Sequence, residues 1–119
     1  MLHITERYHP KGGIIVTENG CAMPEPTRDA ALADPDMRRT AFMHSYIGEM
    51  RLAMAQGADV RGYFAWSLMD NFEWSFGFAK RFGLVHVDYQ TQERVIKPAG
   101  RWYANVIEAN AVQPVAAAS

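Results

Sequence analysis

Hydrophobic residues gather into two short apolar runs separated by a helical stripe. Gly13–Thr17 is a β-branched run next to glycines, and Val60–Leu68 is apolar at most positions. Both runs are typical of strands covered on two faces. Between them, Asp34-Pro35-Asp36 predicts a capped helix start and Gly57 its end. The stripe comprises Met43, Tyr46, Ile47, Met50, Ala53 and Met54, with Arg38, Arg39, Glu49 and Arg51 mostly outside it. This order predicts one βαβ unit, hence a parallel sheet with a right-handed crossover.

The segments around this unit are less regular. Residues 1–11 are polar and mixed, which fits the end of a helix or a loop. Asn19-Gly20 is a turn pair, but Pro24 and Pro26 follow instead of an alternating strand. We therefore expect the first strand to run into a long loop and not into a hairpin.

The second half continues with a loop over residues 69–81 that is rich in aromatic side chains. "RFGLVHVDY" alternates as a short strand does, and Pro98 starts a last helix. The apolar side of that helix comprises Ala99, Trp102, Tyr103, Val106 and Ile107. Residues 111–119 are small and low in complexity, so we expect a flexible tail after a domain over residues 1–110.

Composition narrows the class of protein. The chain has 119 residues, one domain or part of a larger one, with 49% hydrophobic and 21% charged residues. A net charge of -1 gives no reason to expect nucleic acid or an anionic membrane as partner. No apolar run approaches the roughly 20 residues of a membrane span, and the N-terminus has no signal-peptide core. Cys21 is the single cysteine and the four histidines are scattered, so we expect neither a disulfide nor a metal site.

The candidate chemistry lies where the two strands end. Glu18 closes the first strand, and "WSLMDNFEW" carries Trp66, Asp70, Glu73 and Trp74 after the second. In parallel α/β folds, ligands bind at the carboxyl ends of the strands, so these groups should face one pocket. Carboxylates serve as nucleophiles or bases, and tryptophan faces stack on sugar rings. The pattern favours a carbohydrate over a phosphate, because a glycine-rich phosphate loop is lacking.

Simpler explanations exist for the same residues. Glu18 can cap a turn with Asn19, and Cys21 without an identifiable base is a bystander. The loop aromatics Phe72, Trp74, Phe76 and Phe78 can be core residues. The residues by themselves leave these alternatives open.

Long motifs carry a resemblance that favours the sugar hypothesis. "IIVTENG", "VRGYFAWSLMDNFEWSFGFAKRFGLVHVDY" and "KPAGRWYANVI" occur in this order and at these spacings. From about Tyr8 to Asn110 the chain resembles the C-terminal part of family 1 glycoside hydrolases, the β-glucosidase type. The resemblance implies an α/β fold, the seventh and eighth β/α units of a (β/α)₈ TIM barrel.

The resemblance also implies roles for individual residues. Glu18 matches the catalytic nucleophile, and Trp66 matches the tryptophan under the glycon ring. Glu73 matches the glutamate that binds glycon hydroxyls, Trp74 the neighbouring tryptophan, and Phe82 an aromatic lining of the glycon site. On this reading, the buried strand is a rigid mount for the carboxylate that attacks the anomeric carbon.

Other parts of the family site are missing from these residues. Retention requires a second carboxylic acid roughly 5–5.5 Å from the nucleophile. The family carries this acid in an Asn-Glu-Pro motif, and Glu25-Pro26 matches that motif only by chance. The chain would hold the last quarter to third of a barrel, as a fragment, a truncated gene product or a piece that assembles with a partner. We expect the isolated chain to be poorly stable or self-associating and to lack meaningful hydrolase activity. Its strand edges and its inner face, lined by Val16, Phe64 and Trp66, would lie open.

Two functions compete at this point. One is a retaining β-glycosidase acting on terminal non-reducing β-D-glycosyl residues by double displacement, with this chain carrying the nucleophile. The other is a non-catalytic carbohydrate-binding or interaction fragment. Two carboxylates and water suffice for the first, so no cofactor is implied. The expected partners are a small β-glycoside and, through self-association or pairing, the missing part of a barrel.

Overall fold

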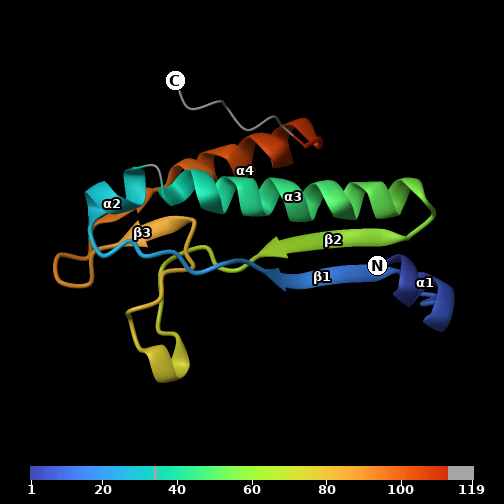
Figure 1. Cartoon of the computed structure of the whole chain (residues 1–119), viewed down its shortest axis with the longest axis horizontal. Helices are drawn as coiled ribbons and strands as arrows, with labels where there is room; N and C mark the ends of the chain where they lie inside the picture. The colour runs from blue at the N-terminus through green and yellow to red at the C-terminus, as the bar shows by residue number, and fades with distance from the viewer. Residues whose placement is uncertain (34, 113–119) are drawn as a thin grey trace.

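The computed structural model describes residues 1–33 and 35–112 as a thin two-layer α/β structure (Figure 1). Its elements are α1 (Leu2–Tyr8), β1 (Ile14–Asn19), α2 (Arg28–Leu32), α3 (Pro35–Ala55), β2 (Val60–Ala65), the 3-10 helix η1 (Trp74–Phe76), β3 (Val85–Val87), β4 (Arg94–Ile96) and α4 (Pro98–Ala109). The first layer is the β1–β2 pair, and α3 and α4 form the second. The α/β class predicted from the sequence is therefore confirmed.

The β1–β2 pair is parallel, as the βαβ pattern predicts. Ile14 pairs with Val60, Val16 with Tyr63, and Asn19 with Ala65. Each strand has the other as its sheet neighbour in the described chain, which leaves one edge of each strand unpaired. β1 extends to Asn19, so Glu18 lies within the strand, one residue before its end.

The core lies between this sheet and the two long helices. Its buried members are Met43, Ile47, Leu84, Ala99, Trp102 and Val106, and a smaller cluster comprises Ala53, Ala58 and Val60. The predicted stripes are thus confirmed at most positions, but Tyr46, Met54 and Ile107 are exposed. Arg39 is buried on the same side of α3 as Met43, which places it on the stripe and not outside it.

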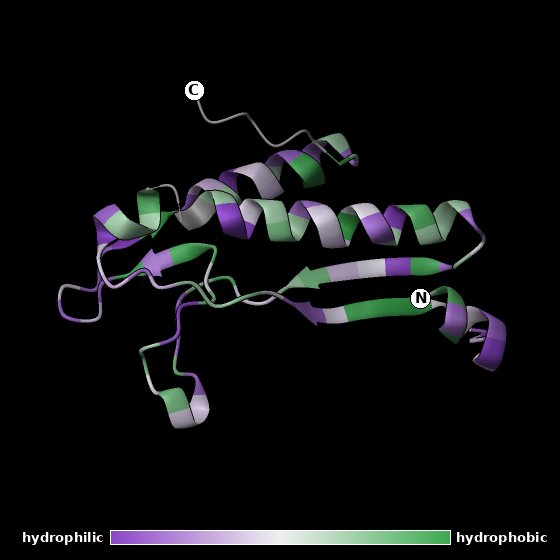
Figure 2. Ribbon diagram, in the orientation of Figure 1, coloured by the Kyte–Doolittle hydropathy of each residue, from purple (hydrophilic) through white to green (hydrophobic). Residues whose placement is uncertain are grey.

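The opposite face of the sheet is open, so the prediction of strands covered on both faces is wrong for the described chain. Ile15 of β1 is 55% exposed and Phe64 of β2 is 60% exposed. Val16, which the sequence places on the open face, is half-buried on the helix side, because Ile15 takes the outward position in the alternation. Figure 2 shows apolar colour along the first half of β1, although one of its faces lies uncovered.

The remaining elements are short. Residues 2–8 form α1, and the predicted strand in "RFGLVHVDY" is β3. β3 pairs antiparallel with β4, which the sequence analysis does not predict, nor does it predict α2. Both are too short, at three and five residues, to show a period.

The helix boundaries follow the sequence signals. α3 begins at Pro35, and Gly57 adopts φ +99° two residues beyond its end. α4 begins at Pro98 as predicted. The capping role expected for Asp34 and residues 113–119 of the expected tail lie outside the described residues.

Candidate functional site

The carboxyl ends of β1 and β2 lie against each other. The Trp66 backbone N–H donates to the Asn19 carbonyl oxygen at 2.8 Å. A Cβ atom at Gly20 would lie 1.8 Å from the Trp66 carbonyl oxygen, so only glycine fits there. The Asn-Gly pair that resembles a hairpin turn in the sequence therefore serves this close backbone approach.

A side-chain bond reinforces the same edge. The Tyr63 hydroxyl donates to Asn19 Oδ1 at 2.8 Å. Burial raises the pKa of Tyr63 to about 12, with smaller contributions from Tyr103 and Cys21, so the hydroxyl keeps its proton at neutral pH. The residue next to Glu18 is thus fixed to β2 through both its backbone and its side chain.

Glu18 and Trp66 are brought together by this pairing. Glu18 is exposed at the penultimate position of β1, one residue before the Asn19 backbone bond to Trp66. Trp66 follows β2, is 38% exposed, and is joined to Ser67 by a cis peptide bond. Glu18 and Trp66 therefore lie at the same end of the paired strands, and both side chains are accessible.

Phe82 belongs to the same neighbourhood through its backbone. The Ser67 N–H donates to the Phe82 carbonyl oxygen at 3.3 Å, directly after Trp66 in the chain. The side chain of Phe82 is half-buried. Three of the five predicted site residues are thus connected by the strand ends and this one bond.

Glu73 and Trp74 lie on a separate excursion of the chain. Glu73 caps η1, and its N–H donates to the Gly77 carbonyl oxygen at 2.7 Å. Trp74 is 82% exposed and adopts φ 41°, a left-handed conformation that is uncommon for a residue other than glycine. Figure 1 shows this yellow segment projecting away from the sheet. The described structure does not place these two side chains against Glu18.

The loop aromatics are not core residues in the described chain. Phe72, Phe76 and Phe78 are exposed, as is Trp74. Phe78 contacts Phe72 and Tyr89 at ring-centroid distances of 5.6 and 4.5 Å. The alternative that assigns them to the core is therefore wrong for these residues, since no second layer covers the loop.

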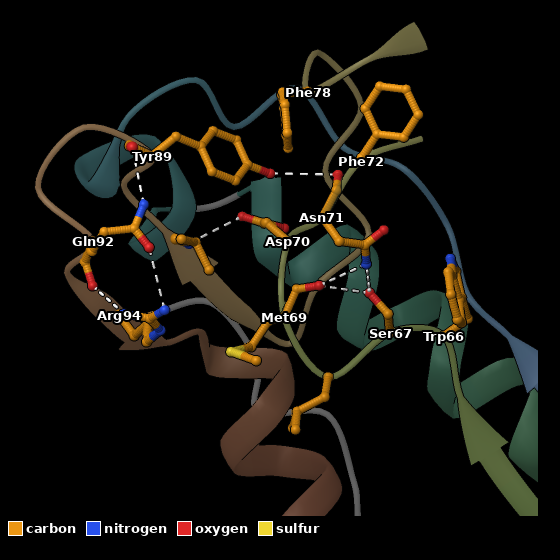
Figure 3. A pocket seen from close by; sticks show the side chains of 12 residues that line it. Trp66, Ser67, Met69, Asp70, Asn71, Phe72, Phe78, Tyr89, Gln92 and Arg94 are labelled. Carbon is orange, nitrogen blue, oxygen red and sulfur yellow. Dashed lines mark hydrogen bonds between the residues drawn. The ribbon is translucent and has the colours of Figure 1, made fainter. Parts of the chain in front are cut away.

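A pocket of about 440 Å³ opens beside this loop (Figure 3). Trp66 stands at one side of it, and Tyr89, Gln92 and Arg94 stand at the other. Of the five predicted site residues, Trp66 alone lines it. Tyr89 donates to the Asn71 carbonyl oxygen at 3.5 Å, a long bond across the pocket.

A buried ion cluster joins the loop after β1, α3 and the segment before α4, and the sequence pattern does not predict it. Its members are Glu25, Arg39, Asp70, Arg81 and Lys97. Lys97 Nζ donates to Glu25 and, at 3.0 Å, to Asp70 Oδ1, while Arg39 Nη2 donates to Glu25 Oε1 at 2.6 Å. Asp70 lines the pocket, as expected for the 66–74 segment, but its carboxylate is already bound by Arg81, Lys97 and the Gly83 N–H.

The sequence holds one weak signal for this cluster. Charged residues occur beside apolar ones at helical spacing, as Arg39 does before Met43. Periodicity treats such a residue as solvent-facing, because a lone buried charge is costly. The described partners of Arg39 lie 14 to 43 residues away in the chain, so only the fold reveals them.

His86 lies beside the cluster in β3. Its Nδ1 is 3.5 Å from Asp70 Oδ2 and has no hydrogen-bond partner in the described structure. Burial and the neighbouring Arg81 lower the pKa of His86, so the ring is neutral near pH 7. The described residues hold no group of three or more His, Cys, Asp or Glu side chains suited to a metal ion.

Comparison with known proteins decides the family. The model for glycosyl hydrolase family 1 matches residues 1–112. The chain belongs to this family. Family 1 relatives include β-glucosidase A of Thermotoga maritima, 40% identical over 110 residues, and a bifunctional β-D-glucosidase/β-D-fucosidase of Bifidobacterium breve, 44% identical over 110 residues. These matches cover 92% and 90% of the chain.

The structural match agrees with this membership. The β-glucosidase from Thermotoga maritima in complex with deoxynojirimycin superposes with a TM-score of 0.85 at 40% identity, over 93% of the chain. The chain spans about a quarter of the relatives' length, 24% of both curated proteins and 25% of the solved chain. No helix among the described residues has the length and apolar character to cross a membrane.

Proposed function

We propose that this chain is the nucleophile-bearing part of a retaining β-glycosidase that hydrolyses terminal non-reducing β-D-glycosyl residues. One observation carries the proposal: in a family 1 chain, Glu18 lies exposed at the end of β1, fixed by backbone pairing beside Trp66. A carboxylate on a rigid strand next to an aromatic platform fits the attack on a sugar held in place.

The chemistry would be double displacement. The Glu18 carboxylate attacks the anomeric carbon, the bond to the leaving oxygen breaks, and a covalent glycosyl–enzyme forms. Water then attacks the same carbon, the bond to Glu18 breaks, and the sugar leaves with its β configuration retained. Trp66 would stack under the glycon ring.

Three further residues would complete the sugar contacts. Glu73 would accept hydrogen bonds from glycon hydroxyls, with Trp74 beside it and Phe82 lining the site. The left-handed backbone of Trp74 supports this assignment, because strained conformations concentrate at functional sites.

The second carboxylic acid would come from outside the described residues. Glu25 stands in the only sequence resembling the expected motif, yet it is 1% exposed and bound by Arg39 and Lys97. Asp70 is bound in the same cluster. Neither carboxylate is available to protonate a leaving group.

The rest of the barrel would supply that acid. We assign β1 and α3 to the seventh unit and β2 and α4 to the eighth unit of a (β/α)₈ barrel, with residues 1–110 as part of the catalytic domain and 111–119 as a tail. Two strands of eight are one quarter, which agrees with the 24–25% share of the relatives' length. The unpaired edges of β1 and β2 would pair with the other strands, and the open face with Ile15 and Phe64 would line the interior of the barrel.

The test is covalent labelling with 2-deoxy-2-fluoro-β-glucosyl fluoride, read by intact mass and peptide mapping. The chain is incubated alone and together with the part of Thermotoga maritima β-glucosidase A that it does not match. We expect an adduct on Glu18 in the mixture and none in the isolated chain, because the acid and most of the sugar site are absent there. Glu18→Gln should abolish labelling in the mixture.

The positive control is the matching segment of the Thermotoga maritima protein with the same complement. If that control labels and this chain does not, the nucleophile assignment is wrong, and sugar binding without labelling would favour a carbohydrate-binding role. An adduct that persists in Glu18→Gln would likewise overturn the assignment.

A further inference from the structure

One arginine of α3 bridges the two loops that leave the strand ends. Arg39 is 1% exposed, and its guanidinium donates to four acceptors within residues 1–33 and 35–112. Nη1 donates to the Cys21 carbonyl oxygen at 2.7 Å and to the Phe82 carbonyl oxygen at 3.2 Å. Nη2 donates to Glu25 Oε1 at 2.6 Å and to the Arg81 carbonyl oxygen at 3.2 Å.

The four acceptors belong to two different segments. Cys21 and Glu25 lie three and seven residues after Glu18 in the chain. Arg81 and Phe82 belong to the segment that pairs with the backbone after Trp66, through the Ser67 N–H bond to Phe82. The planar fork of a guanidinium can serve both segments at once, which an ammonium group cannot do in the same geometry.

The ion cluster fixes this bridge from behind. Glu25 is held from its other oxygen by Lys97, which also binds Asp70. Asp70 Oδ1 accepts from the Gly83 N–H at 2.9 Å, next to Phe82. The bonds from Arg39 through Glu25, Lys97 and Asp70 therefore end at Gly83. This residue adjoins Phe82, whose carbonyl oxygen Arg39 itself binds.

A buried cluster of this kind is a poor device for stability alone. Replacing buried ion pairs by apolar residues is often neutral or stabilising, and in some proteins buried ionic groups instead specify one geometry. Here the bonds define the position of the loop after Glu18, with Cys21 and Glu25, relative to Arg81 and Phe82. None of the four acceptors is itself a proposed reacting atom.

We infer that Arg39 is a positioning residue that sets the Glu18 carboxylate relative to the sugar platform. The inference rests on the proposed function and goes beyond it, since Arg39 would touch neither the sugar nor the reacting atoms. A displacement of about 1 Å at a reacting group costs on the order of 100-fold in rate. The loss of Arg39 should therefore appear in the rate of the chemical step more than in sugar affinity.

The experiment measures the fluoro-sugar labelling rate in the mixture of the chain with the Thermotoga maritima complement. Its dependence on reagent concentration separates the limiting rate constant from the half-saturating concentration. For Arg39→Lys we expect the limiting rate constant to fall roughly 10- to 100-fold while the half-saturating concentration changes much less. Lysine keeps the charge but cannot reach all four acceptors.

Two variants calibrate this result. Glu25→Gln keeps the Arg39 bonds to Cys21 and Phe82, so its limiting rate should fall less than that of Arg39→Lys. Arg61→Lys is the matched control, because Arg61 is exposed and pairs only locally with Asp59, and its rate should equal that of the unaltered chain. The fraction of each variant in the complex is measured by sedimentation, and rates refer to that fraction.

The outcomes separate the two proposals. Labelling of the unaltered chain and of Arg39→Lys at equal limiting rates would overturn the positioning role and leave the proposed function standing. A loss explained wholly by a smaller assembled fraction would overturn it too, since a purely structural role predicts that result. Absence of labelling in the unaltered chain, with the positive control labelled, would overturn both.

Discussion

One region of this chain buries charged side chains, and another exposes large apolar ones. At the carboxyl end of the sheet, Glu25, Arg39 and Lys97 are at most 1% exposed. On the other face and in the η1 loop, Phe64 and Trp74 are 60% and 82% exposed. Charged groups are rarely buried unless they are paired, and large apolar groups are rarely exposed in patches.

The difference shows which contacts the chain makes within itself. The buried charges find partners among the described residues, through bonds from α3, the loop after β1 and the segment before α4. The exposed aromatic and aliphatic residues of the sheet face have no covering layer here. This matches a chain that spans a quarter of its relatives and leaves one sheet face for the remainder.

The largest effect is expected from breaking the buried cluster. Lys97→Met removes the cation shared by Glu25 and Asp70, and breaking a buried ion pair from one side costs about 3–5 kcal/mol. That loss is a large part of the stability of a small domain. We expect the helical circular dichroism signal of this variant to be lost at a much lower urea concentration than that of the unaltered chain.

The matched control for this variant is Arg61→Met. Arg61 forms an exposed ion pair with Asp59, so its loss should leave the urea midpoint unchanged. Equal midpoints for the Lys97 variant and the unaltered chain would contradict a structural role for the cluster.

A smaller effect is expected on the exposed side. Phe64→Ser removes an apolar group from the open sheet face, so the self-association expected of the isolated chain should weaken by roughly tenfold, about 1.4 kcal/mol. Sedimentation velocity over a range of concentrations measures this. Phe76→Ser is the control, since Phe76 is similarly exposed but lies on η1, away from the sheet. A chain that is monomeric at all concentrations would refute the expectation.

The smallest effect concerns pH. The pKa of His86 is lowered, chiefly by burial and then by Arg81. Asp70 and Glu25 act in the opposite direction, and Lys97 lowers the pKa further. As pH falls from 7.5 to 5.5, the unfolded chain binds a proton near pH 6.5 before the folded chain does. Stability should therefore decrease on acidification, by at most about 1.4 kcal/mol per pH unit.

Urea midpoints at several pH values measure this dependence. His86→Gln should flatten it, because glutamine does not titrate, whereas replacing the exposed His3 by Gln should leave it unchanged. A midpoint that rises as the pH falls to 5.5 would have the wrong sign for a neutral buried ring.

Much of the fold was predictable because it depends on local pattern. β1, α3, β2 and α4 follow from apolar runs, from Pro35 and Pro98 at helix starts, and from Gly57 after a helix end. The family motifs were readable too, since they are continuous in the chain. The positions proposed for catalysis and sugar binding come from those motifs, and the structure brings Glu18, Trp66 and Phe82 into one neighbourhood.

The sequence by itself determined the order of β1, α3, β2 and α4, the parallel pairing and the family, because each is written in short segments of adjacent residues. Only the tertiary structure decided that Arg39 and Glu25 are buried partners and that Ile15, not Val16, faces outward. The physical reason is the same in both cases. Burial of a charge and the open side of a sheet depend on which distant segments lie nearby, and sequence periodicity carries no information on that.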